Sequence, residues 1–335
     1  RGVTIARNRF RHFGSYGGRD MATLGIAASG MRPLVERVDI VENTFIECTF
    51  SINVVVSGAT EGAIRDTRIV RNTVLDAVAG AISIELNGPA AIGGSITRTL
   101  IAGNRFSRSK DQAVVMWGGL NGASGNTVSS VWFHNNIVDN YPGGVFVIGG
   151  MGGSRNNRVE NVQIANSTFY GTERPVSAQS NAAAADVGNT FARLDIRNSI
   201  FWNSQHDFWN EVLPEHVSFS ITTAASFVGT QRNFSADPLF VAPQTGDFRL
   251  QAGSPAIDKG TADLAPTLDM FCRPRLGAPD LGALEFGALQ SICSTELPMF
   301  PLNIVLPSRA GELVRTALAI DRSSIRRAAY RSLVR

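Results

Sequence analysis

Residues 69–74 read IVRNTV and residues 101–106 read IAGNRF, two copies of a pattern Ile-x-x-Asn-x-Phe that returns at intervals of 29 to 35 residues. A motif that recurs at a nearly fixed interval of this length predicts a solenoid, in which each repeat forms one rung and stacks on its neighbours. The copies begin at Ile5, Ile40, Ile69, Ile101, Phe133, Ile164 and Ile196.

Two positions of the motif form columns when the copies are stacked. Asn tolerates left-handed backbone angles and bonds to neighbouring amides, so the asparagines predict a ladder at a bend, and the aromatic column is expected inside the coil. The ladder column is Asn8, Asn43, Asn72, Asn104 and Asn136, followed by Ser167 and Ser199. The inner column is Phe10, Phe45, Val74, Phe106, Val138, Phe169 and Phe201.

The spacing of apolar residues indicates strands. Val38 and Ile40, like Val162 and Ile164, lie two residues apart, which is the period of a strand with one buried face. A second apolar run follows in each rung, at 52–57, 81–87, 113–118 and 144–149. We therefore expect an all-β fold, a parallel β-helix with two strands per rung.

Composition narrows the class of protein. The chain has 335 residues, 44% hydrophobic content and 33 glycines, which suits a long continuous core with many tight corners. The net charge is +3, and no basic stripe with interleaved aromatics indicates nucleic-acid binding. No apolar run is long enough to predict a transmembrane segment. We expect a monomer.

The two ends of the sequence differ from the repeats. The chain begins in mid-repeat without an initiator Met or a leader, which is typical of a fragment that lacks earlier segments. Residues 309–335 carry seven arginines and apolar residues at helical spacing, which predicts a basic helix, either solvated or lying on a membrane surface or on the solenoid. Cys272 and Cys293 are close enough in sequence for a disulfide, which would suit an oxidising compartment, although the sequence does not require it.

The segment 236–286 carries the most specific motifs. It reads DPLF at 237–240, GDFRL at 246–250, GSPAID at 253–258 and DLGALE at 280–285. This segment resembles the terminal module of bacterial right-handed parallel β-helix repeat proteins of the pectate-lyase-like superfamily. The resemblance implies right-handed coiling, a secreted or cell-surface location and association with polysaccharide. It does not imply catalysis. We divide the chain into rungs 1–234, a cap module 235–287, and a linker with a basic tail 288–335.

The residues of this module favour a cap. Its Asp-Pro and Ser-Pro pairs predict turns, and Phe240, Phe248, Leu250 and Ile257 are expected to plug the open end of the core. Asp258, Asp269 and Asp280 are interpreted as turn formers that bond to backbone amides. A Ca²⁺ site is the alternative for these oxygen-rich loops, although no EF-hand spacing is present.

Titratable side chains gather at one edge of successive rungs. Lys110 and Asp111, Glu173 and Arg174, and His206 and Asp207 occupy the ninth to eleventh positions of their rungs, and Asp139 and Tyr141 lie near that place in the intervening rung. Stacking would line these residues along a patch about 15 Å long, a length that suits an oligosaccharide. The candidate catalytic residues are Lys110, Asp111, Asp139, Glu173 and Arg174, and the candidate substrate-binding residues are Trp117, Tyr141, His206 and Asp207.

Three roles remain open for this edge. Asp139 or Asp111 with Glu173 would make a glycosidase pair or an ion site bridging uronates. Lys110 would instead serve as a base that abstracts the proton beside a uronate carboxyl, if its neighbours lower its pKa. The simpler interpretation is that these charged residues lie in solvent-exposed turns and have no catalytic role.

The second strands of the rungs have a partly apolar outer face. Val55, Glu85, Met116 and Val147 are aligned on this face, which predicts a covering loop or tail. Alternatively, aromatics such as Trp117 and Tyr141 would stack against sugar rings.

No signature of a polygalacturonase, pectin methylesterase or pectate lyase is present; Arg273-Pro274-Arg275 does not match the last. The sequence therefore favours an extracytoplasmic protein that binds polysaccharide, and either cleaves it as a lyase or glycosidase or does not. A non-catalytic surface, adhesion or structural solenoid is the rival function.

Overall fold

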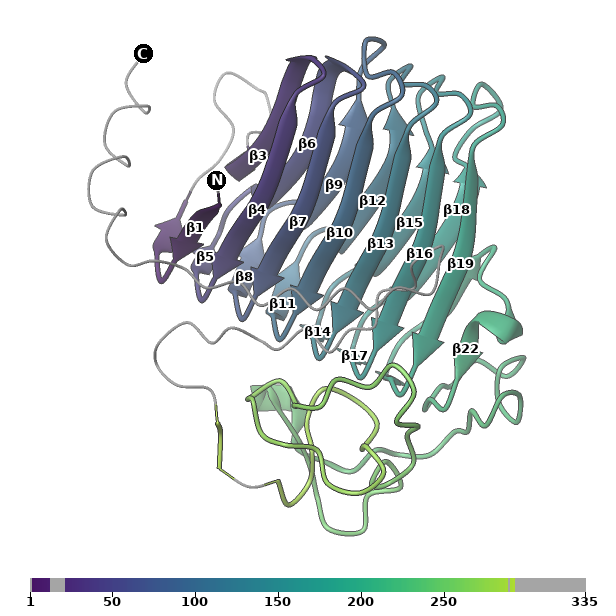
Figure 1. The fold of residues 1–335 in the computed structure, drawn as a ribbon. Coiled ribbons are helices and arrows are strands. Elements are labelled where there is room, and N and C mark those ends of the chain that lie inside the picture. Colours follow the sequence, from purple (N-terminus) through teal and green to yellow (C-terminus); the bar gives the residue numbers. More distant parts are fainter. Residues whose placement is uncertain (1, 13–21, 289, 293–335) are drawn as a thin grey trace. The chain divides into compact units, whose positions relative to one another are not determined.

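The computed structural model describes residues 2–12, 22–288 and 290–292, which form three parallel sheets running the length of a β-solenoid (Figure 1). Sheet A contains β1 (Val3–Ala6), β4 (Leu34–Val41), β7 (Ala63–Val70), β10 (Ser95–Ala102), β13 (Thr127–His134), β16 (Arg158–Ala165), β19 (Thr190–Arg197) and β22 (Val217–Ser218). Sheet B contains β2 (Arg9–Arg11), β5 (Thr44–Ile46), β8 (Thr73–Ala77), β11 (Arg105–Ser109), β14 (Ile137–Asp139), β17 (Thr168–Tyr170) and β20 (Ile200–Trp202).

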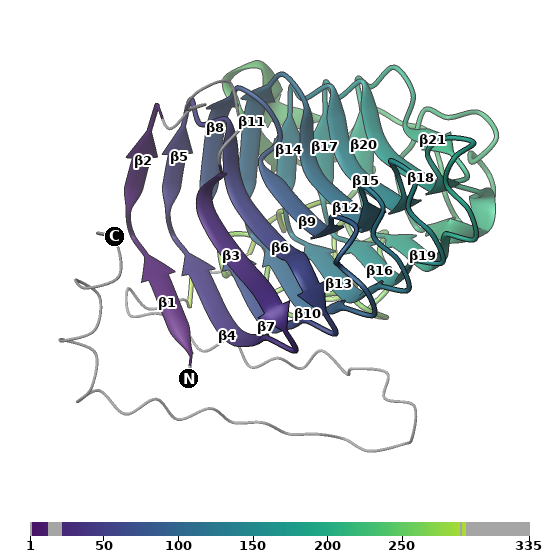
Figure 2. The same cartoon turned by 90° about the horizontal axis from the view of Figure 1, so that it is seen from above.

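Sheet C completes each rung with a third strand, so the expectation of two strands per rung was wrong. The Ile-x-x-Asn-x-Phe motif itself spans a corner, because its leading residue is next to last in a strand of sheet A and its Phe lies in sheet B. Figure 2 shows the strands of these two sheets from above. Sheet C contains β3 (Ala22–Met31), β6 (Phe50–Thr60), β9 (Ile82–Asn87), β12 (Gln112–Leu120), β15 (Gly143–Gly150), β18 (Arg174–Asn181) and β21 (Phe208–Asn210).

The predicted register between rungs is confirmed. Ile5 pairs with Ile40, Ile40 with Ile69, and Ile69 with Ile101, and the series continues to Ile196. Their side chains, together with the inner column, line one continuous core. The repeat therefore sets both the stacking and the buried face, as expected of a solenoid.

The asparagine ladder is also confirmed. The side chain of Asn104 accepts from the backbone N–H of Asn72 at 2.8 Å, and its amide group donates to the carbonyl oxygen of Ile69. Asn43, Asn72 and Asn136 repeat these bonds, while Ser167 and Ser199 continue them with hydroxyls. A second ladder at the corner from sheet C to sheet A consists of Asn126, Asn157 and Asn189.

The inner column is filled by aromatic rings from two positions of the motif, the last position and, in one rung, the leading position. Phe169 and Phe201 stack with ring centroids 5.0 Å apart. Where the column has the smaller Val138, the leading residue of that rung is Phe133 instead of Ile, and its ring lies 6.2 Å from Phe106 and 6.0 Å from Phe169. The larger leading residue thus fills the space that valine leaves, as close packing requires.

Left-handed residues mark the corner from sheet A to sheet B on every rung. In the first rungs this column is charged, and its members form an ion-paired chain in which Glu42 accepts from Arg7 at 2.8 Å and from Arg71 at 2.6 Å. From Asn135 onward the column consists of asparagines. Its members are Arg7, Glu42, Arg71, Gly103, Asn135, Asn166 and Asn198.

The outer face of sheet C differs from the prediction by one residue. Met116 and Val147 belong to the core. The residues that pair with one another on the outer face are instead Glu85, Trp117 and Ile148. The face is nevertheless partly apolar.

Residues before the terminal module close the end of the core. Phe227 packs on Phe208 with centroids 4.3 Å apart, and Phe208 packs edge-on against Phe201. Val212 and Val217 belong to the same core cluster. A short 3₁₀ helix, η1 (Pro214–His216), lies between them.

The module 237–287 covers the outer face of sheet B rather than plugging the core, which corrects that expectation. Phe240, Phe248, Leu250 and Leu281 form a second cluster with residues of β14, β17 and β20. The module contains the antiparallel pair β23 (Phe240–Ala242) and β24 (Asp247–Leu250), joined by η2 (Pro243–Thr245). The left-handed asparagines hold it, since Asn135 donates to Leu268, Asn166 to Asp280 and Asn198 to Thr261.

The contacts of the DLGALE segment account for the residue types at its positions. Gly282 has a left-handed φ of 86°, and a Cβ there would stand 2.7 Å from Oγ1 of Thr168 in sheet B. Asp280 accepts from the backbone of Asp258 and Phe286, and Glu285 is ion-paired with the buried Arg275 at 2.9 Å. The motif therefore builds the contact with the solenoid.

Two predictions concern residues that the structure does not describe. These are the predicted basic tail, 309–335, and the pairing of Cys293. Cys272 is buried and disulfide-bonded, and Cys48 is a free, buried thiol. No helix in the described part of the chain is both long enough and apolar enough to cross a membrane.

Candidate functional site

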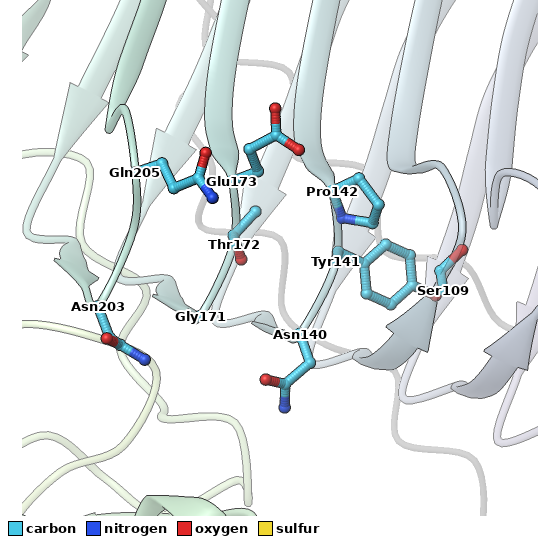
Figure 3. A pocket seen from close by; sticks show the side chains of 9 residues that line it. All are labelled: Ser109, Asn140, Tyr141, Pro142, Gly171, Thr172, Glu173, Asn203 and Gln205. Carbon is cyan, nitrogen blue, oxygen red and sulfur yellow. The ribbon is translucent and has the colours of Figure 1, made fainter.

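A pocket of about 390 Å³, termed here the corner pocket, lies where four successive rungs turn from sheet B to sheet C (Figure 3). The turns arise because Asn140, Gly171 and Asn203 adopt left-handed angles, which Asn and Gly tolerate best. The pocket is lined by Ser109, Asn140, Tyr141, Pro142, Gly171, Thr172, Glu173, Asn203 and Gln205.

A charged and aromatic cluster lies beside the pocket. Glu173 is ion-paired with Arg174, with Oε1 2.9 Å from Nη2, and both side chains are about two-fifths exposed. The guanidinium carbon of Arg174 stands 5.5 Å from the ring centre of Trp209, whose ring is 5.0 Å from that of His206. Glu173, Arg174, His206 and Trp209 are termed the corner cluster below.

The predicted edge is partly assembled. Gln112, Gly143 and Arg174 pair across β12, β15 and β18, so the residues before them, Asp111, Pro142 and Glu173, also lie in line. Asp111 and Glu173 are two rungs apart, or about 10 Å along the solenoid. Burial raises the pKa of the Asp111 carboxyl, and a backbone hydrogen bond from Gln112 opposes this. Lys110, the neighbour of Asp111, is exposed.

Asp139, another catalytic candidate, lies away from this edge, in register with Tyr170 of sheet B. Its side chain is on the outer face of sheet B, beneath the terminal module, and is only 5% exposed. It accepts a hydrogen bond from Ser107 at 2.7 Å and pairs with Arg105 at 3.3 Å. A carboxylate held in this way supports the module's attachment.

Tyr141 and Asp207, two of the predicted substrate-binding residues, are buried. The ring of Tyr141 belongs to the core, edge-on to Phe106, and burial raises the pKa of its hydroxyl. Asp207 is buried and accepts from Thr222 at 2.6 Å and from the backbone N–H of Thr223 at 2.7 Å. Neither presents a surface on which a sugar ring can stack.

The remaining candidates lie apart from one another. Trp117 is on the outer face of β12, between Glu85 and Ile148, away from the corner. His206 is exposed and belongs to the corner cluster.

Sequence reasoning missed most of the uncharged lining of the corner pocket. Asn140, Thr172, Asn203 and Gln205 carry no charge and were passed over in favour of titratable neighbours. The signal that marks them is the left-handed column, in which Asn or Gly recurs at one register and turns the next residues outward.

The described residues contain no group of three or more His, Cys, Asp or Glu side chains that could hold a metal ion. In the terminal module, Asp269 accepts from the backbone of Phe271 and Arg273 and pairs with the Arg273 guanidinium, while Asp280 accepts from two backbone amides. Their interpretation as turn formers is therefore confirmed.

Comparison of the sequence with protein-family profiles and with curated proteins found no match. The fold is a parallel β-solenoid.

Proposed function

We propose that this protein is an extracytoplasmic member of the pectate-lyase-like superfamily that binds polysaccharide at the corner pocket. The observation that supports this most directly is the corner cluster, because it places an ion pair and an exposed indole beside a concave surface. The corner pocket has a contributor from each of several rungs, and rungs repeat about every 4.8 Å, so that a linear polymer finds equivalent groups along its length.

The chemistry of the corner suits sugars. Trp209 is 40% exposed, so its ring offers an apolar face, and Asn140, Asn203 and Gln205 supply amides that bond to hydroxyls. Arg174 provides the cationic group that a uronate carboxylate requires. Acidic polysaccharide is therefore the favoured substrate class, with neutral chains as comparators.

The test is affinity electrophoresis or calorimetry with a panel of uronate and neutral polysaccharides. We expect Arg174→Gln together with Trp209→Ala to lose binding at least tenfold, because it removes the cation and the stacking surface. Glu160→Gln is the matched control, since Glu160 is ion-paired with Arg158 at 2.8 Å on sheet A, away from the corner. Equal binding by the corner variant and the wild type, with both folded, would exclude the corner as the polysaccharide-binding site.

Cleavage is a second proposal, supported by the alignment of Asp111 with Glu173. Inverting glycosidases hold their carboxyl groups about 6.5–9.5 Å apart, close to the two-rung spacing. Asp111, with its raised pKa, would protonate the leaving oxygen, and Glu173 would activate water. New reducing ends released by the wild type but not by Asp111→Asn would support this pair. Unsaturated products would instead indicate a lyase and Lys110 as base.

A non-catalytic surface or adhesion protein is the rival function. It is favoured by the structural roles of Asp139 and Asp207, which leave few free carboxylates at the edge. Binding of polysaccharide without release of cleavage products would favour this non-catalytic function.

The proposed location outside the cytoplasm is supported by the disulfide at Cys272, since disulfides persist in oxidising compartments. Fractionation of the native host, with alkylation of free thiols, tests it. A reduced Cys272 in a cytoplasmic fraction would contradict it. The proposed monomer is tested by light scattering.

A further inference from the structure

A second pocket, of about 250 Å³, lies in the seam between sheet B and the terminal module, and is termed here the seam pocket. The solenoid contributes Tyr170 from β17 and Trp202 from β20, and the module contributes Phe240, Gln244 and Gln251. No role in the corner site requires this pocket. We propose that the seam pocket binds a single neutral pyranose ring.

The apolar wall of the seam pocket consists of aromatic rings that pack against one another. Tyr170 and Phe240 are nearly buried and meet edge-on, with centroids 6.3 Å apart, and Phe248 packs against both at 5.4 Å. Trp202 is only partly buried and packs against the same cluster. A ring that enters therefore meets aromatic surface without a rearrangement of the wall, which lowers the cost of binding.

The polar groups of the seam pocket have unused capacity. Gln244 accepts from the hydroxyl of Tyr170 at 3.0 Å, which leaves its two N–H donors for a ligand. Gln251 donates to the carbonyl oxygen of Phe240 at 2.8 Å, which orients the amide and leaves its oxygen as an acceptor. One amide donor and one amide acceptor facing the same space match the hydroxyls of a sugar, each of which donates and accepts.

Charge and size select against other ligands. Asp237 is the one charged side chain among those lining the pocket, all of which the structure describes, and one of its oxygens already accepts from Leu239 at 2.9 Å. An anionic ligand would find no cation there. The volume is below the roughly 300–1,000 Å³ of pockets for drug-sized ligands, so one ring fits better than a chain.

The two pockets share their separating wall. Tyr170 and Trp202 line the seam pocket, and the next residues along the chain, Gly171 and Asn203, line the corner pocket. A terminal or side-branch sugar at the seam would therefore lie one turn of backbone away from the corner. Binding at the seam nonetheless depends on its own residues alone.

The experiment is titration of the whole protein with methyl pyranosides of glucose, galactose and mannose, followed by NMR line broadening and tryptophan emission. A ligand of this size in a small pocket is expected to bind with a Kd on the order of millimolar. Gln244→Ala, whose side chain is exposed, and Trp202→Phe should each weaken binding at least fivefold. Glu160→Gln, on sheet A and ion-paired with Arg158, is the control that should leave it unchanged.

Three results would overturn the proposal: no saturable binding of any pyranoside, equal binding by wild type and both seam variants, or preferential binding of tetramethylammonium, which would make the aromatic wall a cation site. A melting temperature equal to that of wild type shows that each variant is folded. Failure of the corner variants alone would contradict the proposed function and leave the seam proposal standing.

Discussion

The guanidinium of Arg105 is ion-paired with the carboxylate of Asp139 on the next rung, 3.3 Å from Nη2 to Oδ1, and donates from Nη1 to the carbonyl oxygen of Gly246 at 3.0 Å. This arginine thus joins two rungs to the terminal module. The pair explains why a carboxylate that the repeat places near a corner is unavailable for chemistry there.

Asp139→Asn should destabilise the protein by about 1–3 kcal/mol, because it removes the charge that holds Arg105 and weakens a buried hydrogen bond from Ser107. Urea denaturation measures this. The control is Asp66→Asn, whose pair with Arg98 is more than one third exposed and should contribute at most about 1 kcal/mol. Equal losses in the two variants would contradict the anchoring role.

Asn104→Ala should cost about 1–3 kcal/mol, since it leaves the buried backbone N–H of Asn72 without its acceptor and the carbonyl of Ile69 without its donor. Asn8→Ala, at the exposed start of the ladder, should cost less. Chemical denaturation of both variants compares them, and a larger loss at Asn8 would mean that the ladder does not stabilise through burial.

Asn166 separates backbone strain from docking. Its φ is 45°, and its side chain donates to the carbonyl oxygen of Asp280. Asn166→Gly removes the hydrogen bond but suits the left-handed angle, whereas Asn166→Ala also strains the backbone. We expect the alanine variant to be less stable than the glycine variant by about 1–2 kcal/mol. Thermal unfolding measures the difference, and the reverse order would exclude strain as the cause.

His134 should make stability depend on pH. Burial lowers its pKa from 6.5 to about 4, so the folded state keeps the imidazole neutral where the unfolded chain protonates it. The unfolded state therefore binds more protons between these values, and stability falls as pH is lowered through this window, by about 3 kcal/mol in total.

The measurement is urea denaturation of the wild type and His134→Gln from neutral pH to about pH 4. Asp280 contributes the opposite slope, because burial raises the pKa of its carboxyl to about 6 and stability from this group is lost as pH rises through that value. It is common to both proteins and cancels in their difference. A pH-independent difference would show that His134 is not buried neutral.

If the corner cleaves polysaccharide, its rate should reflect Asp111. A general acid with a raised pKa stays protonated to higher pH, so kcat/KM should fall as pH rises through that pKa. Asp111→Asn should lose turnover with little change in affinity. A rate that is insensitive to this substitution would exclude Asp111 as the acid.

The repeat predicted the fold because its signal is both local and periodic. Ile69 and Asn104 hold their registers, since a ladder and a buried column each need one residue type at one place in every rung. The third strand was missed because its runs were merged with their neighbours. Met116 and Val147 were placed one residue away from Trp117 and Ile148, which pair in line with Val55 and Glu85, because the number of residues between the leading residue and this position differs from rung to rung.

The site was predicted less well because burial of a corner residue depends on what packs over it. Asp139 and Glu173 are both carboxylates near the corner from sheet B to sheet C, yet the module covers the first and leaves the second at a pocket. The position of the module on sheet B follows from the asparagines at 135, 166 and 198, whose outward amides look in the sequence like ordinary turns.

The alternating charges of the left-handed column also restrict how the gene can change length. Recombination between repeats would delete or duplicate whole rungs, and loss of the rung that carries Glu42 would bring Arg7 beside Arg71, two cations at one corner. In the later rungs the column is uncharged, but Asn135, Asn166 and Asn198 each meet a different carbonyl of the module. Repulsion between Arg7 and Arg71 and the loss of these attachments would therefore both disfavour deletion of the rungs concerned.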